Sequence, residues 1–142
     1  MVDFGEYAAA ITMIRFVVKG RPVSVQGSPV SKNAWQQRVA LAARPKCQEL
    51  LAGNNLSIKI TFFYNALPDF DTDNISKPIC DALNNVVYGD DHQLAQRTAG
   101  RRDINGSYRI RGVEPELAVA IAEGEDFVYV EVGEMSADPG LV

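Results

Sequence analysis

The chain contains little histidine and cysteine. Its 142 residues include one histidine, His92, and two cysteines, Cys47 and Cys80, which form no close pair in the sequence. Two isolated cysteines are most often buried thiols without a metal-binding or redox role. A single histidine beside an aspartate in a turn is more often neither a base nor a ligand, so we leave His92 out of the candidate catalytic residues.

Long apolar runs are also absent. No apolar stretch approaches the roughly 18 residues that a membrane span requires, and the N-terminus has no basic region followed by a long apolar one. We therefore expect neither a membrane span nor a signal peptide. The length and the apolar content of 46% are typical of one globular domain with one core. We expect residues 1–12 to be a loose extension or to precede the natural start at Met13, residues 13–133 to be the domain and residues 134–142 a tail.

Basic residues are absent from the C-terminal part of the chain. Residues 112–142 carry eight acidic residues and no lysine or arginine. All 14 basic residues lie in residues 1–111 with the other 10 acidic residues, six of which fall between residues 69 and 91. If bound metal neutralises several of those six, the body of the domain is basic. The net charge of −4 is thus a weak objection to a nucleic-acid partner.

Apolar periodicity and turn residues predict alternating strands and helices. Residues 56–64, for example, alternate as a half-buried strand does. The predicted order begins with strand 11–19, a helix capped by Ser31 or Asn33 and ended by Pro45, and strand 56–64. A helix capped by Asp73 or Asn74 follows and runs to about residue 86. Strand 93–104, a short extended segment at 108–113, helix 114–123 and strand 127–132 complete the chain. The fold class is α/β (α+β), a single domain with helices packed on one mixed β-sheet in β-α-β-α-β-α-β order.

Carboxylates and one lysine gather between the second and third predicted strands. The stretch reads Asp71-Thr72-Asp73-Asn74-Ile75-Ser76-Lys77, then Asp81-Ala82-Leu83, then Asp90-Asp91-His92-Gln93. In an extended backbone Asp71 and Asp73 point to the same side, about 7 Å apart, so a cation between them is plausible. A strand-helix-strand path can return Asp91 beside them. Oxygen ligands suit Mg²⁺, and a metal held by three carboxylates suits phosphodiester hydrolysis.

Lys77 adds a cation to this site. It lies one helical turn beyond Asp73, where it can contact the scissile phosphate or the developing negative charge. Purely structural interpretations exist as well: Lys77 and Asp81 have the spacing of a helix salt bridge, Asp73 can be a helix cap and Asp90 a turn residue. These structural interpretations leave the joint presence of Asp71, Asp73 and Asp91 to coincidence, so we favour a metal site.

A calcium loop is a further alternative. A loop starting at Asp69 would place aspartates at its first, third and fifth positions. Asn74 then stands where glycine is required and Cys80 where glutamate is required, so the loop fails at two decisive positions.

Three arginines follow Asp91 along the third predicted strand. Arg97 and Arg101 share a face by their even spacing, and Arg102 lies beside them. We predict that they track DNA phosphates leading into the site, with Lys32 contributing from the loop before the first helix.

The motif resembles that of the RusA-like endodeoxyribonucleases, a family of Holliday junction resolvases. The family's hallmark is Asp-x-Asp-Asn-x-x-Lys, then Asp-Ala-Leu, then Asp-Asp-x-Gln, which residues 71–77, 81–83 and 90–93 match in spacing and order. The turn Gly20-Arg21-Pro22-Val23 also resembles the family's start. The resemblance covers about residues 13–133.

The resemblance implies a small mixed α/β homodimer that cuts four-way DNA junctions symmetrically with Mg²⁺ or Mn²⁺, in DNA recombination and repair. By motif position Asp71, Asp73 and Asp91 match the family's essential aspartates, Lys77 its essential lysine, and Asp90 a further carboxylate near the site. Residues 13–133 would then be a nuclease domain of a cytoplasmic, nucleoid-associated protein encoded by a bacterium or phage. Its partners would be branched DNA and a second copy, with no membrane.

Several points stay open on the sequence alone. Ser24 and Gln26 stand where many members have lysine or arginine, and Lys32 is a possible substitute. The dimer interface is expected at the apolar helix face around Trp35 and Val39 or at an edge strand. A nuclease of the same fold for other branched DNA, or a catalytically idle DNA-binding or metal-binding module, are the alternatives.

Overall fold

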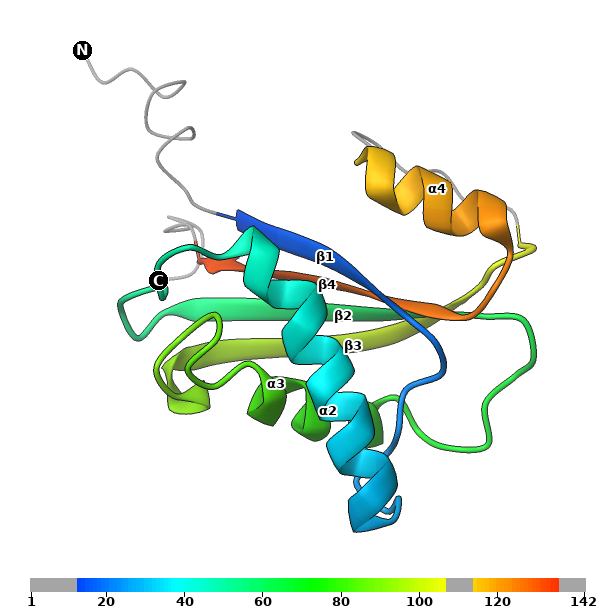
Figure 1. Cartoon of the computed structure of the whole chain (residues 1–142), viewed down its shortest axis with the longest axis horizontal. Helices are drawn as coiled ribbons and strands as arrows, with labels where there is room; N and C mark the ends of the chain where they lie inside the picture. The colour runs from blue at the N-terminus through cyan, green and yellow to red at the C-terminus, as the bar shows by residue number, and fades with distance from the viewer. Residues whose placement is uncertain (1–12, 107–113, 136–142) are drawn as a thin grey trace, which may run out of the picture.

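The structure, a computed structural model, describes residues 13–106 and 114–135 (Figure 1). Its elements are β1 (Met13–Lys19), α2 (Pro29–Ala43), the 3₁₀ turn η1 (Arg44–Lys46), β2 (Leu56–Tyr64), α3 (Asp73–Ala82), the 3₁₀ turn η2 (Asp91–Gln93), β3 (Leu94–Asp103), α4 (Pro115–Glu123) and β4 (Phe127–Glu134). The predicted order and the α+β class of a single domain are confirmed. The predicted segment 108–113 lies outside the described residues.

The four strands form one mixed sheet in the order β1-β4-β2-β3. β4 runs antiparallel to both of its neighbours, and β2 and β3 are parallel. A parallel pair needs a crossover connection, and α3 supplies it. β1 and β3 are therefore the edges, and β3 starts beside the start of β2.

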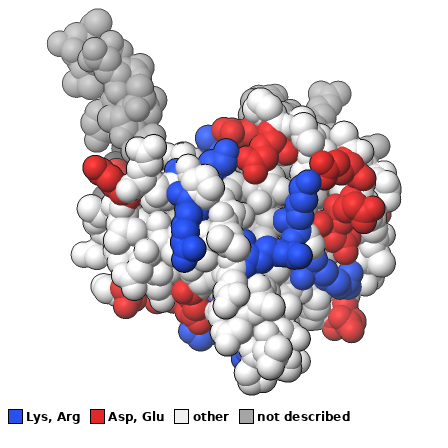
Figure 2. Space-filling model, viewed as in Figure 1, with Lys and Arg blue, Asp and Glu red and all other residues white. Residues whose placement is uncertain are grey.

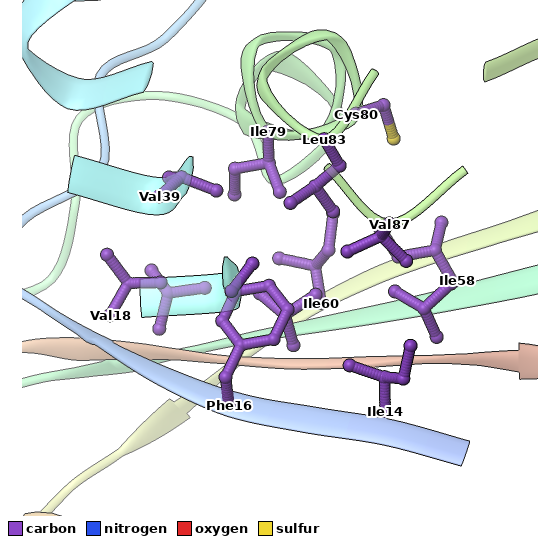
Figure 3. Packing of buried hydrophobic residues seen from close by; sticks show 14 of the residues in the cluster. Ile14, Phe16, Val18, Val39, Ile58, Ile60, Ile79, Cys80, Leu83 and Val87 are labelled. Carbon is purple, nitrogen blue, oxygen red and sulfur yellow. The ribbon is translucent and has the colours of Figure 1, made fainter. Parts of the chain in front are cut away.

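The helices cover the sheet unequally. α2 and α3 lie side by side on one face and α4 lies on the other (Figure 1). Alternate residues of β1, β2 and β4 enter the core under α2 and α3, where side chains of strands and helices meet (Figure 3). The smaller cluster under α4 consists of Val17, Phe63, Ile104, Leu117, Ala120, Phe127 and Tyr129.

The first helix begins earlier than predicted. α2 starts at Pro29, and Ser28 caps it by accepting a hydrogen bond from the Ser31 N–H at 3.1 Å. Proline suits the first helical position because its missing N–H would have no partner there. Ser31 and Asn33, the predicted caps, therefore lie inside the helix. Pro45 ends α2 as predicted.

Trp35 and Val39 lie on the buried face of α2. Trp35 is 3% exposed and Val39 is fully buried in the core of the same chain. The prediction that this face forms a dimer interface is therefore wrong, because the sheet already covers it. Cys80 is buried in the same core, and Cys47 is partly exposed.

The second predicted helix, α3, contains a proline and ends early. Pro78 cannot donate to the carbonyl of Asn74, and such a loss inside a helix costs about 3 kcal/mol. The Val25 N–H replaces it, donating to that carbonyl at 2.9 Å. The proline thus opens a docking point for the loop before α2. At the other end α3 stops at Ala82 rather than near residue 86, and Asn85 adopts a left-handed conformation with φ 61°.

No helix in the described part of the chain is long and apolar enough to span a bilayer.

Candidate active site

Asp71 and Asp73 lie at the N-terminal end of α3. Asp73 is the first residue of the helix, and the residue before it, Thr72, makes no side-chain capping bond. The predicted capping roles of Asp73 and Asn74 are therefore wrong. Both aspartates are exposed, and neither side chain has a hydrogen-bond or ion-pair partner among residues 13–106 and 114–135. Two carboxylates without partners are free to take a ligand.

Aromatic stacking fastens the loop that leads to Asp71. Phe70 stacks on Phe62 of β2 with ring centroids 6.2 Å apart. The guanidinium of Arg21 lies 5.8 Å from both ring centroids, within the range of a cation–π contact, and also reaches Asp126 at 3.5 Å. Arg21 belongs to the Gly20-Arg21-Pro22 turn, so this turn and the strand end hold the approach to the Asp71/Asp73 pair.

Lys77 lies in the middle of α3, one turn beyond Asp73. Its ammonium forms the ion pair with Asp81 that their spacing predicts, at 3.3 Å. The Lys77 side chain is 67% exposed, so the pair is weak and the ammonium remains accessible. Lys77 also lines a cleft of about 390 Å³ between α2 and α3, which Lys32 lines from the other side.

Asp90 and Asp91 lie at the opposite end of α3, in the turn before β3. Asp90 caps η2, accepting from the His92 backbone N–H at 2.9 Å, and this bond is the main reason that its pKa falls below the usual value. The pKa of Asp91 is raised, first by burial and then by a hydrogen bond with Asp90, with Asp81 also contributing. The Asp91 carboxylate thus lies near those of Asp90 and Asp81, which oppose its ionisation, while Arg97 favours it.

Arg97 holds Asp91 in place. Its guanidinium donates to the Asp91 carbonyl at 3.2 Å and lies 3.6 Å from the Asp91 carboxylate. The arginine that we predicted to contact phosphate is thus engaged with an aspartate of the motif.

Two residues that support this turn have no role in the sequence-based prediction. The Gln93 carboxamide accepts from the N–H groups of Gly89 and Asp90 and donates to the carbonyls of Leu51 and Gly53, at 2.9 to 3.1 Å. The Tyr88 hydroxyl donates to the Cys80 carbonyl at 2.7 Å, which ties the turn to the last turn of α3. The position of Gln93 in the Asp-Asp-x-Gln motif was a signal in the sequence that could have identified it. No sequence pattern indicated the role of Tyr88.

One chain does not bring all of the predicted ligands together. Asp81, which neighbours Asp91, follows Asp73 by eight helical residues, or about 12 Å along the axis. Within the described residues, no three carboxylate, histidine or cysteine side chains converge closely enough to hold a metal ion. The structure instead shows two groups, Asp71 with Asp73 at one end of α3 and Asp81, Asp90 and Asp91 at the other.

The chemistry of the donors fits Mg²⁺. The four predicted metal ligands, Asp71, Asp73, Asp90 and Asp91, are all carboxylates, the hard oxygen ligands that Mg²⁺ prefers, and one or two of them per ion suffice when waters and phosphate oxygens complete the shell. The observation that favours such an ion is the unpartnered state of Asp71 and Asp73 within the described residues.

The remaining predicted DNA contacts lie on both faces of the sheet. In the β2–β3 ladder Arg97 pairs with Ile58 and Arg101 with Phe62, whose side chains face α2 and α3. Arg102 pairs with Phe63, which faces α4. Paired residues share a face, so Arg101 lies on the side of the motif and Arg102 on the opposite side.

A mixed sheet with carboxylates and a lysine along one covering helix has the groups that phosphodiester hydrolysis needs. The sequence model of the family described as Endodeoxyribonuclease RusA matches residues 18–122. The chain therefore belongs to the RusA endodeoxyribonuclease family, whose members act on Holliday junctions. The match includes every residue of the candidate site. No curated protein matches the chain.

Proposed function

We propose that this chain is a Mg²⁺-dependent, structure-selective endonuclease that resolves four-way DNA junctions by paired phosphodiester hydrolysis, in recombination and repair. Family membership supports the class of enzyme, and one observation carries the site. The carboxylates of Asp71 and Asp73, unpartnered within the described residues, lie at the start of α3, and the accessible ammonium of Lys77 lies one turn beyond Asp73. Mn²⁺, with the same preference for oxygen ligands, is expected to substitute for Mg²⁺.

Each group has a distinct task in this proposal. Asp71 and Asp73 would hold the metal, which when bound activates water and stabilises charge on the phosphate. Lys77 would stabilise the negative charge that develops in the transition state. Its pairing with Asp81 holds the ammonium on the surface of α3 until phosphate competes for it. Asp91, positioned by Arg97, would supply a further carboxylate and Asp90 would support it.

We further propose that the chain acts as a homodimer. Two symmetric cuts across a junction require two active sites related by a two-fold axis. A dimer would also account for the distance along α3 between the two carboxylate groups, because Asp91 of one subunit would then lie beside the Asp71/Asp73 pair of the other. Of the two predicted interfaces, the buried face of α2 is excluded and an edge strand remains.

Cleavage of a synthetic four-way junction tests the function. Junction, flapped duplex and linear duplex of the same sequence would be incubated with Mg²⁺, with Mn²⁺ or with chelator. We expect paired cuts in the junction alone and only with metal. Preferred cutting of the flap would make the chain a nuclease for other branched DNA. Binding of the junction without cleavage in either metal would make it an idle DNA-binding module.

A further inference from the structure

A cleft of about 390 Å³ lies between α2 and α3. These two helices lie side by side on the face of the sheet that carries the motif (Figure 1). The walls of the cleft include Lys32, Asn33 and Gln36 from α2 and Lys77 and Asp81 from α3. Only Lys77 among these polar residues of α2 and α3 has a place in the proposed chemistry. The cleft therefore extends the site toward a helix that the motif does not include.

The cleft carries a net positive charge. Two lysines face one aspartate across it, and that aspartate is already paired with Lys77. Lys32 has no carboxylate within ion-pair distance in the described part of the chain; its ammonium donates only to the Val25 carbonyl, at 3.2 Å. An ammonium bound to one neutral carbonyl keeps two N–H donors and its full charge for an anion.

Hydrogen bonds across the cleft fix its two walls. The Gln36 side-chain amide donates to the Pro78 carbonyl of α3 at 3.1 Å. Val25, whose carbonyl holds Lys32, donates its own N–H to the Asn74 carbonyl that Pro78 leaves free. Lys32 is thereby tied through Val25 to the residue next to Asp73. The cleft is held in a fixed position relative to the proposed metal ligands.

We propose that this cleft binds a backbone phosphate of the DNA, adjacent to the phosphate that is cut, with Lys32 and Asn33 as its positioning residues. Lys32 supplies charge and the Asn33 amide a donor; Gln36 holds the wall. A phosphate in the cleft sets which neighbouring phosphodiester reaches Asp71, Asp73 and Lys77. The inference rests on the proposed nuclease function and identifies a part of that same site.

The test combines two variants with single-phosphate substitution. Lys32→Gln removes the charge and Asn33→Ala removes the amide, which makes no hydrogen bond within the described residues. Lys59→Gln is the matched control, because Lys59 is exposed on β2 and its side chain points to the α4 side of the sheet. Four-way junctions would carry one neutral methylphosphonate at successive positions around the cleavage point. Metal-free binding and single-turnover cleavage with Mg²⁺ would be measured for each, after thermal melting has shown that the variants fold.

We expect one position next to the cut where the methylphosphonate weakens binding to the wild type and to Lys59→Gln but not to Lys32→Gln. At that position the magnitude of the slope of log Kobs against log salt should decrease by about one for the methylphosphonate alone or for Lys32→Gln alone. Combining the two should decrease it no further. Asn33→Ala should weaken binding there without changing the salt slope. Additive losses at every position, or variants indistinguishable from Lys59→Gln, would overturn the cleft assignment.

The binding arm separates this inference from the function on which it rests. If the junction binds with the single sensitive position but is not cleaved in Mg²⁺ or Mn²⁺, the proposed nuclease function is contradicted and the assignment of the cleft as a phosphate site is supported. If cleavage is unaffected by Lys32→Gln and Asn33→Ala, the proposed nuclease function is supported and the assignment of the cleft as a phosphate site is contradicted. Absence of binding to any DNA would remove both.

Discussion

Asp71 and Asp73 differ from the other carboxylates of the motif in having no hydrogen-bond or ion-pair partner within residues 13–106 and 114–135. Asp81 pairs with Lys77, Asp90 caps a turn and Asp91 contacts Arg97. A residue whose side chain makes no contact contributes little to stability, so a strong effect of its replacement on activity points to a ligand role.

Asp73→Asn should abolish cleavage while changing the free energy of unfolding by less than about 0.5 kcal/mol. The amide keeps the volume of the side chain and removes the charge that Mg²⁺ requires. Junction affinity without metal should stay equal or rise, because one repulsion with phosphate disappears. Cleavage and urea denaturation, with Asp71→Asn in parallel, measure the two effects. Near-normal activity of both variants would contradict the metal-ligand assignment.

Lys77→Ala separates a catalytic role from a purely structural one. The Lys77–Asp81 pair is exposed, so its loss should cost only a few tenths of a kcal/mol of helix stability. If Lys77 stabilises the transition state, the single-turnover rate on pre-bound junction should fall by about 10²-fold. Asp81→Asn, which breaks the same ion pair and keeps the lysine, is the control. Equal and small rate changes in the two variants would leave Lys77 as a helix residue.

Asp91 gives a pH dependence whose sign can be stated. Burial, Asp90 and Asp81 raise its pKa above 3.8, and Arg97 opposes them. The native state then holds this proton more tightly than the unfolded chain. Its contribution to stability is present below about pH 4 and is lost as the pH rises through the raised value. Asp91→Asn should therefore raise the melting temperature of metal-free protein at pH 7 and not at pH 3. A shift of the same size at both pH values would contradict this account.

At the scale of single elements, Gln93 holds the turn that presents Asp90 and Asp91. Gln93→Ala removes two accepted and two donated hydrogen bonds and should cost about 1–3 kcal/mol of stability in urea denaturation. Cleavage should fall as well, because Asp91 loses its position. Gln93→Glu should keep the bonds from Gly89 and Asp90 and lose those to Leu51 and Gly53. His92→Ala, with its side chain 74% exposed, should change stability by less than about 0.5 kcal/mol.

The elements also show how far local sequence patterns reach. Strand β2 could be predicted residue by residue, because alternation reports directly on the two faces of a sheet. The start of α2 could not, since Ser28, Ser31 and Asn33 are all good caps and only the Ser28–Pro29 step selects one. Pro78 pointed to a cost within α3, but its compensation by Val25 depends on a loop that is distant in sequence.

The candidate site was predictable as a set of residues and not as a geometry. The spacing of the aspartates and the lysine identifies the candidate catalytic groups, because that spacing is a property of the motif sequence itself. Placing Asp91 relative to Asp71 and Asp73 depends on the length and direction of α3, which separates them. Likewise, no local signal assigned Arg97 to Asp91, since that contact requires the turn of η2.

At the scale of the whole molecule, the acidic C-terminal segment is paired with basic residues of the N-terminal part. Lys19 bonds Glu123, Arg21 bonds Asp126 and Lys46 bonds Glu116, while Arg15 contacts both Glu114 and Glu131. Figure 2 shows acidic and basic side chains next to one another on this side. On that face the acidic and basic side chains therefore neutralise one another. On the face of the sheet that carries the motif, Lys32 in the α2–α3 cleft and Arg101 on β3 have no ion-pair partner among the described residues.

The separation of the two carboxylate groups leads to a prediction about the assembled protein. Asp73→Asn and Asp91→Asn should each be inactive as pure proteins. If one subunit supplies Asp73 and its partner Asp91 to a shared site, a hybrid of the two variants contains one site with both defects and one site with none. Mixing and refolding them together should then restore nicking of one strand of a four-way junction, without the paired second cut. If each site lies within one chain, every site in the hybrid carries one defect and nicking stays absent. A tandem fusion of the two variants, compared with a fusion of two Asp73→Asn copies, fixes the hybrid composition and makes the outcome independent of exchange.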